Sequence, residues 1–273
     1  MSTKTLKMKM RTIHRKLKEQ QDARKAGIYL RWIHTRDMPG SGIKTRLVCE
    51  KAAADELHLM SEAEHAAFLE AWWRADVETI FDHQALDRGK TQRAALCINI
   101  DHPTYIGRTE PAVLSTDLVL NVRRGRTYKR EAISVRSART DGRATLTRTQ
   151  LIERRTWEDD AAIFKAVAFH GMHKNRSKNL AWIFRAHNDT VGRQLSASEL
   201  TAQSELMRIL KSRKDMRVVD ACRYVDSKFQ LPSGSGVQAF RQLAGRKALA
   251  FDLNTSDPVR LLTGDVWKPK RPV

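Results

Sequence analysis

The stretch LSTDLVLNVRRGRTYKREAISVRSA, residues 114–138, has two runs of alternating apolar and polar residues around a basic turn. Alternation with a period of two predicts β-strands, here over 115–122 and 130–137. The break between them is centred near Gly125 and Arg126. The stretch therefore predicts an antiparallel hairpin, which is the centre of a sheet if other strands join it.

The register of this hairpin brings an acidic residue close to the second strand. A turn at its centre sets Asp117 opposite about Ser134, and Arg136 shares the face of Ser134 because alternate residues of a strand face the same way. Glu131 has the other parity and is expected on the opposite face. Metal-dependent phosphodiester cleavage uses carboxylates to hold Mg²⁺, with an acid and a lysine on the next strand. Here that next strand reads Ser134-Val135-Arg136.

Further elements on both sides of the hairpin predict a mixed α/β order in the first part of the chain. Strand patterns and amphipathic helix patterns alternate there with turn residues such as Pro and Gly. We expect two strands in 28–50, a helix from Ser61 to about Trp73, strands in 77–87 and 97–107, a helix at 148–160 and a strand at 161–169. This order is typical of a mixed sheet flanked by helices.

The composition changes at 171–179, which is polar, basic and free of large apolar side chains, so we place a domain junction there. Helix patterns follow, with a Gly-rich break at 232–236 and two short apolar runs near the end. Two helices about a turn and then a β-ribbon are typical of a winged helix; a plain helical bundle would give a similar pattern. The expected domains are a basic arm (1–27), an α/β domain (28–170) and a winged-helix-like domain (171–273).

The charge of the chain favours a polyanionic partner. Fifty Lys and Arg against 31 Asp and Glu leave a net charge of +19, which points first to nucleic acid. An anionic membrane surface is the rival partner, but the sequence has no long apolar run and no lipidation motif. Three widely spaced cysteines indicate neither a zinc site nor disulfides, and they fit a reducing cytoplasm. The basic arm is expected to be partly helical and either ordered on DNA or a solvated tail.

The sequence allows two roles for Glu64. Ser61 and Glu64 form an S-x-x-E capping box, in which the glutamate only stabilises the start of a helix. Glu64 also shares a helix face with Phe68, Ala71 and Trp72, which puts its carboxylate at the rim of the buried side. The local pattern alone leaves both roles open.

Several pieces of the chain, taken in order, resemble the TnsA family, the endonuclease subunits of heteromeric cut-and-paste transposases. The pieces are WIHTRDMPGSG, LHLMSEAEHAAFLEAWW, VETIFDHQAL, LSTDLVL, EAISVRSA and ERRTW, which lie within about 28–170. The resemblance implies a restriction-endonuclease-like core followed by a winged-helix-like domain. It also implies Mg²⁺-dependent cutting at the 5′ ends of a bacterial mobile element, with Mn²⁺ as a substitute, by a cytoplasmic protein associated with the nucleoid.

The resemblance also implies partners and site residues. A DDE-type transposase would cut the 3′ ends, and an AAA+ ATPase regulator would bind the C-terminal part. Glu64 and Asp117 take the positions of the family's helix and strand acids, with the Val135 carbonyl as a further metal ligand. The family has Gln-x-Lys where this chain has Ser134-x-Arg136, so both catalytic positions of the second strand are changed. Arginine keeps the charge but cannot give up a proton, and it could still clamp a phosphate.

Basic residues gather beside this expected site. Residues 123–155 contain eleven Arg and Lys against three acidic residues, a density that favours contacts with the DNA backbone over a merely solvated face. The residues expected to bind DNA are Arg123, Arg124, Arg126, Arg139 and Arg143.

Three functions remain open from the sequence. The first is an active endonuclease within a transposase complex. The second is a degenerate subunit of the same fold that holds DNA and supports assembly. The third is a free-standing basic regulator that reads DNA through its C-terminal helices, which leaves the pairing of Glu64 with Asp117 unexplained.

Overall fold

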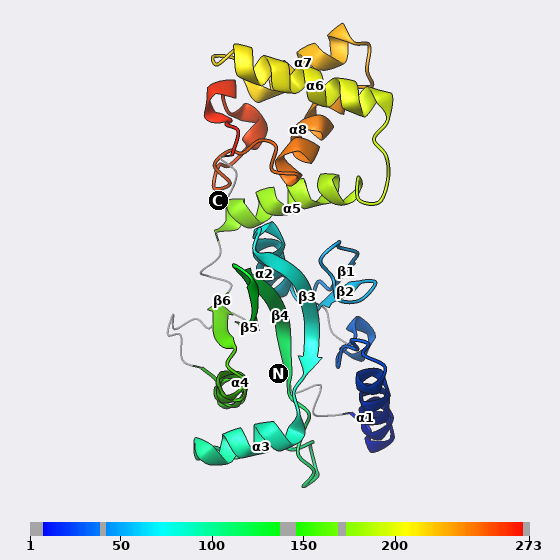
Figure 1. Ribbon diagram of the computed structural model, residues 1–273, viewed down its shortest axis with the longest axis vertical. Helices are drawn as coiled ribbons and strands as arrows, with labels where there is room; N and C mark the ends of the chain where they lie inside the picture. Colours follow the sequence, from blue (N-terminus) through cyan, green and yellow to red (C-terminus); the bar gives the residue numbers. More distant parts are fainter. Residues whose placement is uncertain (1–7, 39–41, 137–145, 169–172, 270–273) are drawn as a thin grey trace. The chain divides into compact units, whose positions relative to one another are not determined.

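The computed structural model describes residues 8–38, 42–136, 146–168 and 173–269. The chain divides into two compact units, Met1–Gly171 and Met172–Val273. Figure 1 shows that the first unit contains the sheet and the second is mostly helical. The mixed α/β class predicted from the sequence, a mixed sheet flanked by helices followed by a helical region, is confirmed.

The first unit is built on a four-stranded mixed sheet with the order β3-β4-β5-β6. Its strands are β3 (Val77–Ala85), β4 (Ser115–Arg124), β5 (Thr127–Arg136) and β6 (Ile163–Ala168). The pairs β3–β4 and β4–β5 are antiparallel, whereas β5–β6 is parallel. The hairpin of β4 and β5 therefore occupies the centre of the sheet, with a strand on each side.

The hairpin has the register expected from its turn. Leu118 pairs with Ile133 and Arg124 pairs with Thr127, so Asp117 aligns with Ser134. The turn itself contains Gly125, whose φ of 63° is in the left-handed region that glycine adopts without strain.

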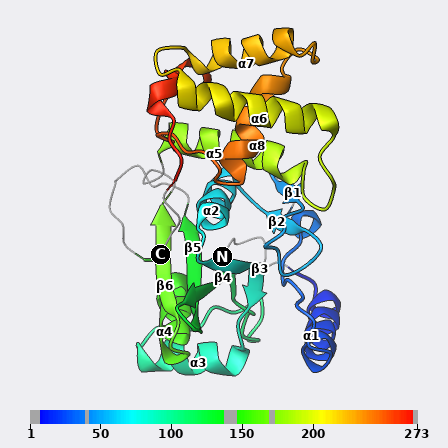
Figure 2. The same cartoon turned by 45° about the horizontal axis from the view of Figure 1, so that its top comes forward.

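Three helices cover this sheet. The helices α3 (Arg88–Cys97) and α4 (Arg148–Asp159) pack on one face, where a buried cluster includes Val119 of β4 and Trp157 of α4. The helix α2 (Glu62–Trp73) packs across β3, β4 and β5. In Figure 2, α3 and α4 lie together at the end of the sheet away from α2. The sheet and the helices α2 and α4 supply side chains to the site described below.

The basic segment at the start of the chain is a docked helix, α1 (Met10–Lys25). Ile13 is fully buried and packs with Tyr105 and Ala112. The Lys16 ammonium group donates to the Trp32 carbonyl at 2.7 Å and to Asp37 at 2.6 Å. The helix is therefore held by contacts within the chain and is not a solvated tail.

Replacing Lys16 by methionine tests how firmly α1 is held. Methionine keeps an apolar stem but leaves the Asp37 carboxylate, 18% exposed, without its cation. We expect the free energy of unfolding to fall by about 3 kcal/mol, the usual cost of breaking a buried ion pair. Urea unfolding of Lys16→Met beside Lys18→Met, an exposed lysine of the same helix, measures this loss. Equal stability of the two variants would mean that the buried pair contributes nothing.

Two predictions for the first unit are wrong in detail. Instead of a hairpin within 28–50, the described residues there contain a short 3₁₀ helix (Thr35–Asp37) and the strand β1 (Thr45–Leu47). That strand pairs instead with β2 (Leu57–Leu59), which lies further along the chain. The region 97–107 has no strand but a single β-bridge, between Thr104 and Pro111. The helix α3 before it was not expected.

The second unit contains the helices α5 (Lys174–Asn188), α6 (Ala197–Ser212), α7 (Val218–Lys228) and α8 (Ser235–Gly245). A polar network joins α6 to α8 in its interior. Gln242 donates to Glu199 at 3.0 Å and accepts from Gln203 at 2.6 Å.

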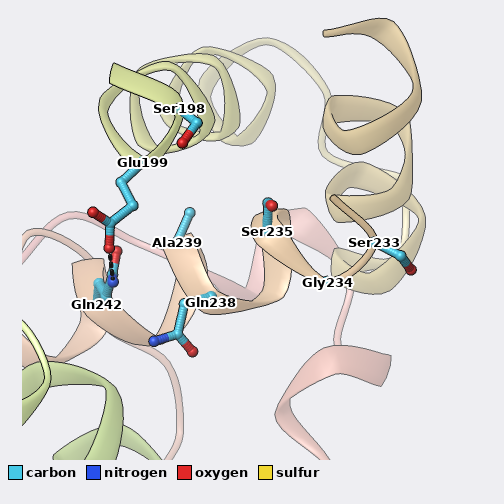
Figure 3. Close-up of a pocket in the computed structure, with 8 residues that line it drawn as sticks. All are labelled: Ser198, Glu199, Ser233, Gly234, Ser235, Gln238, Ala239 and Gln242. Atoms are coloured by element: carbon cyan, nitrogen blue, oxygen red, sulfur yellow. Dashed lines mark hydrogen bonds between the residues drawn. The ribbon is translucent and has the colours of Figure 1, made fainter. Parts of the chain in front are cut away.

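A polar pocket of about 290 Å³ lies beside this network, between α6 and the start of α8. Figure 3 shows Glu199 bonded to Gln242 on one side of it, with Ser233 on the opposite side. The first N–H groups of α8 are already bonded, because Asp226 accepts from Gly234 and Gly236. Within the lining of the pocket, Glu199 and Gln242 therefore satisfy each other.

The two short strands expected after α8 are not formed as strands. Among the described residues this segment makes isolated bridges, Ala250 with Trp267 and Arg217 with Leu262. The winged-helix assignment therefore stays a prediction. Arg241 of α8 donates to the Trp182 carbonyl and lies over the Trp182 ring.

Among the described residues, no helix combines the length and the apolar composition that crossing a bilayer requires.

Candidate active site

Asp117 lies in a row of residues that runs across three strands. Asp82 pairs with Leu118 and Gln84 with Thr116, so His83 of β3 faces Asp117 of β4. On the other side, Asp117 aligns with Ser134 of β5. Because paired residues of neighbouring strands project to the same face, the row places an imidazole, a carboxylate and a hydroxyl together.

Glu64 caps its helix and also faces this row. Its backbone N–H donates to Ser61 Oγ at 3.1 Å, and its carboxylate accepts from the Met60 N–H at 2.7 Å. The same carboxylate oxygen, Oε2, is 3.3 Å from His83 Nε2. Glu64 therefore stabilises the start of α2, and its carboxylate also lies next to His83.

His83 lies between the two acids that the sequence singled out. Its Nε2 faces Glu64, and its Nδ1 is 4.0 Å from Asp117 Oδ1. The side chain is 2% exposed, and neither ring nitrogen makes a hydrogen bond of normal geometry. Burial would lower the pKa of His83, but the Glu64, Asp117 and Asp82 carboxylates raise it above its usual value.

The backbone at His83 is strained, with a φ of 50°. A positive φ is uncommon for a residue with a side chain, and such residues cluster at functional sites. Sequence reasoning missed His83. The signal was available, because pairing the strand at 77–87 with the hairpin would have set it opposite Asp117.

Asp117 is held by the next strand and retains partial access to solvent. Its Oδ2 accepts from the Val135 N–H at 2.7 Å, and 25% of its side chain is exposed. Loss of surrounding water and the charge of Glu64 raise the pKa of Asp117 to about 6. This carboxyl group is therefore easily protonated when no cation is near.

Glu153 of α4 is a third acid at this site, and the sequence analysis counted it only as part of the local charge. It is 2% exposed, and its Oε2 accepts from Thr116 Oγ1 at 3.5 Å. Burial and then the charge of Asp117 raise the pKa of Glu153 to about 8. No local motif marked it, because it belongs to the site only through the packing of α4 on the sheet.

The strand β5 carries Ser134, Val135 and Arg136, and each is placed in a different way. Ser134 is 4% exposed and its Oγ accepts from Gln150 Nε2 of α4 at 3.0 Å. Val135 contributes its N–H to Asp117. Arg136 is half-buried at the last position of β5, two residues after Ser134 and so on the same face.

Glu131 is on the other face, as its parity predicted. It is fully buried and accepts from Arg74 at 2.7 Å, from Lys165 at 2.8 Å and from Arg124 at 3.1 Å. The Arg74 guanidinium, with Lys165, holds the pKa of this acid down at about 2. Glu131 is a structural anion that ties the sheet to the end of α2.

The arginines expected to bind DNA are only partly described. Arg123, Arg124 and Arg126 are exposed near the turn of the hairpin. Arg123 pairs with Glu78, and Arg124 pairs with Asp76 and Glu131. The positions of Arg139 and Arg143 lie outside the described residues.

The chemistry of these groups fits a divalent cation. The charge of Glu64 raises the pKa of the Asp117 carboxyl group, and the charge of Asp117 raises the pKa of the buried Glu153. A bound cation would offset this repulsion. Within the described ranges, no three His, Cys, Asp or Glu side chains already converge as ligands of one ion. Water and a DNA phosphate would have to complete the coordination.

Comparison with known proteins finds similarity to a transposition protein. A family model described as "TnsA endonuclease C terminal" matches residues 172–253. The chain is 26% identical over 246 residues to the transposon Tn7 transposition protein TnsA of Escherichia coli, an alignment that covers 89% of this chain and 86% of that protein. It includes Glu64, Asp117 and most of both units. On these two matches, the chain resembles TnsA proteins over most of its length.

Proposed function

We propose that this chain is the endonuclease subunit of a heteromeric transposase and that it hydrolyses phosphodiester bonds at the 5′ ends of a mobile element. The observation that carries the proposal is Asp117, partly open to solvent and flanked by Glu64 and Glu153. Three acids around an accessible strand position form a site that suits a divalent ion on a DNA phosphate.

Each residue has a distinct part in this proposal. Asp117 would hold Mg²⁺ or Mn²⁺, with the Val135 carbonyl as a backbone donor and Glu64 behind them. A divalent ion there activates water and offsets charge on the leaving oxygen. Arg136 clamps the scissile phosphate with its planar fork. Ser134, fixed by Gln150, orients a water molecule beside Asp117.

Partners follow from the same proposal. The DNA would be the ends of the element, bound through arginines of the hairpin and of the region after it. A DDE-type transposase would cut the other strand, and an AAA+ ATPase regulator would bind the C-terminal unit. Genes for both proteins beside the gene for this chain are the expected arrangement.

The structure of the transposition products tests the proposal. In the reconstituted system, a subunit that cuts the 5′ ends releases the element and gives simple insertions. Sequencing of both strands at the junctions locates the cuts. Cuts at 5′ ends that require this chain support the proposal, whereas simple insertions formed without it would contradict the proposal.

A scaffold without its own chemistry is the second candidate, favoured by one observation. Ser134 and Arg136 replace the Gln-x-Lys of the family pattern, so the usual proton-exchanging lysine is missing. Uncut 5′ ends would leave donor and target joined, and the products would be cointegrates. Cointegrates that still need this chain would favour the scaffold.

Replacing Arg136 by lysine measures what the arginine does. Lysine can exchange a proton with the attacking water and arginine cannot, so we expect Arg136→Lys to raise the nicking rate by about 10-fold. Nicking of end-labelled DNA in the assembled complex gives the rate. Arg130→Lys, an exposed position of the same strand, is the control. A lower rate for Arg136→Lys alone would show that the guanidinium fork on the phosphate matters more.

A further inference from the structure

His83 has the surroundings of a metal-binding histidine. It is 2% exposed, it lies between two carboxylates, and its strained backbone holds it opposite Asp117. A buried imidazole with no regular hydrogen bond at either nitrogen is costly to keep unless it has another partner. Glu64 is a close partner for Nε2, whereas Nδ1 faces the Asp117 carboxylate at a longer distance and makes no hydrogen bond.

The two nitrogens of His83 face groups of different kinds. Nε2 is 3.3 Å from Glu64 Oε2, close to hydrogen-bond distance. The Glu64 carboxylate is itself fixed by the Met60 N–H and by the start of its own helix. A histidine that binds a metal through one nitrogen usually donates its other N–H to such an anchored carboxylate. Glu64 is therefore placed to orient His83.

The other nitrogen, Nδ1, is 4.0 Å from Asp117 Oδ1. Two donors that bind the same ion at about 2.1 Å each lie no more than about 4.2 Å apart. The separation of Nδ1 and Oδ1 is within this limit, whereas it is too long for a hydrogen bond between them. Asp117 is the partly exposed member of the pair, so water and a phosphate can reach the same point.

We propose that His83 binds the divalent ion of the nuclease site through Nδ1, together with Asp117, and that Glu64 orients His83 instead of binding the ion directly. This inference rests on the proposed function. It changes the role of Glu64 and adds a nitrogen to an otherwise all-oxygen set of ligands. Two protein side chains, a backbone carbonyl, water and DNA phosphate then make up the coordination.

A nitrogen ligand changes which metal the site prefers. Mg²⁺ favours oxygen donors, whereas Co²⁺ and its neighbours in the first transition row also bind imidazole well. A site with His83 as ligand therefore prefers Co²⁺ over Mg²⁺ more strongly than an all-oxygen site of the same charge. The ratio of the two affinities is a property of the ligand set and needs no cleavage reaction.

The test is metal binding by the full-length protein without DNA. Co²⁺ affinity is measured by its absorption spectrum and Mg²⁺ affinity by competition. Proton NMR of the Co²⁺ form detects the shifted N–H of a coordinated histidine. The variant is His83→Asn, because asparagine tolerates a positive φ and offers an oxygen near the position of Nδ1. Circular dichroism and thermal unfolding check that it is folded.

We expect His83→Asn to lose the shifted N–H signal and to lower the Co²⁺-to-Mg²⁺ affinity ratio by about 100-fold. Glu64→Gln is expected to keep the signal and to weaken Co²⁺ binding by about 10-fold, the usual effect of changing an orienting carboxylate. His14→Asn, an exposed histidine of α1, is the matched control and should change neither value.

Different results overturn different parts of the proposal. If Asp117→Asn abolishes Co²⁺ binding and His83→Asn leaves the ratio and the signal unchanged, His83 is not a ligand and the nuclease site remains. If neither variant changes Co²⁺ binding, no ion binds at this place and the proposed function loses its metal site. Loss of the signal in Glu64→Gln but not in His83→Asn would also contradict the assignment.

Discussion

Asp117→Asn is expected to lower metal-dependent nicking at the 5′ ends by at least about 1,000-fold, equivalent to roughly 4 kcal/mol of transition-state stabilisation. The reason is local. Asparagine has nearly the same shape and can still accept from the Val135 N–H, which Asp117 bonds at 2.7 Å. The substitution removes the negative charge of Asp117, whose side chain faces His83 and is 25% exposed. The loss would be in the rate and not in the fold.

The measurement is single-turnover nicking of end-labelled DNA by the assembled transposase at saturating Mg²⁺. Asp101→Asn, an exposed acid outside the site, is the matched control and should nick normally. The midpoint temperature of thermal unfolding should be unchanged in Asp101→Asn. It should be equal or higher in Asp117→Asn, because Glu64 repels the Asp117 carboxylate. Normal nicking by a folded Asp117→Asn protein would remove Asp117 from the active site.

The second large effect concerns stability, through Glu153. The pKa of this acid is about 8 in the folded protein, against an ordinary value of 4.5. Between these values the folded state keeps a proton that the unfolded state has released, so stability falls as the pH rises. Glutamine in its place has no proton to lose. We expect Glu153→Gln to match the unchanged protein near pH 4.5 and to be more stable by about 4 kcal/mol at pH 8.

Urea unfolding of the metal-free protein at pH 5, 6, 7 and 8 follows this difference. Asp117, whose pKa is raised to about 6, acts in the same direction but over a lower range, so the change between pH 6 and 8 reports Glu153. Glu158→Gln, at an exposed position of the same helix, should show no such trend. A constant difference between Glu153→Gln and the unchanged protein across this range would mean that Glu153 is ionised throughout.

The centre of the sheet could be predicted from the sequence because its signals are local. Alternation over 114–138 and the glycine of a two-residue turn define the hairpin and the alignment of Asp117 with Ser134. Glu64 was found in the same way, from a capping pattern next to an apolar helix face. Parity alone placed Glu131 away from the site.

The features that were not predicted from the sequence depend on contacts between distant segments. His83 and Glu153 enter the site only when β3 pairs with β4 and α4 packs on the sheet, and neither residue belongs to a local motif. The strand β1 was paired with the wrong segment because its partner β2 is short and fully buried. The start of the chain was taken for an arm because a buried lysine, Lys16, looks like a solvated one in the sequence.

The turn of the hairpin, far from the acids of the site, does not tolerate an inserted residue. Arg124 pairs with Thr127 across two turn residues, and this closure decides that Ser134 aligns with Asp117, seven residues along the strand. One inserted residue at the turn would move β5 by one position and reverse the faces of its side chains. Ile133 or Val135 would then stand where the hydroxyl is. The identity of the exposed turn residues can thus drift, while their number is fixed by an active site about 25 Å away.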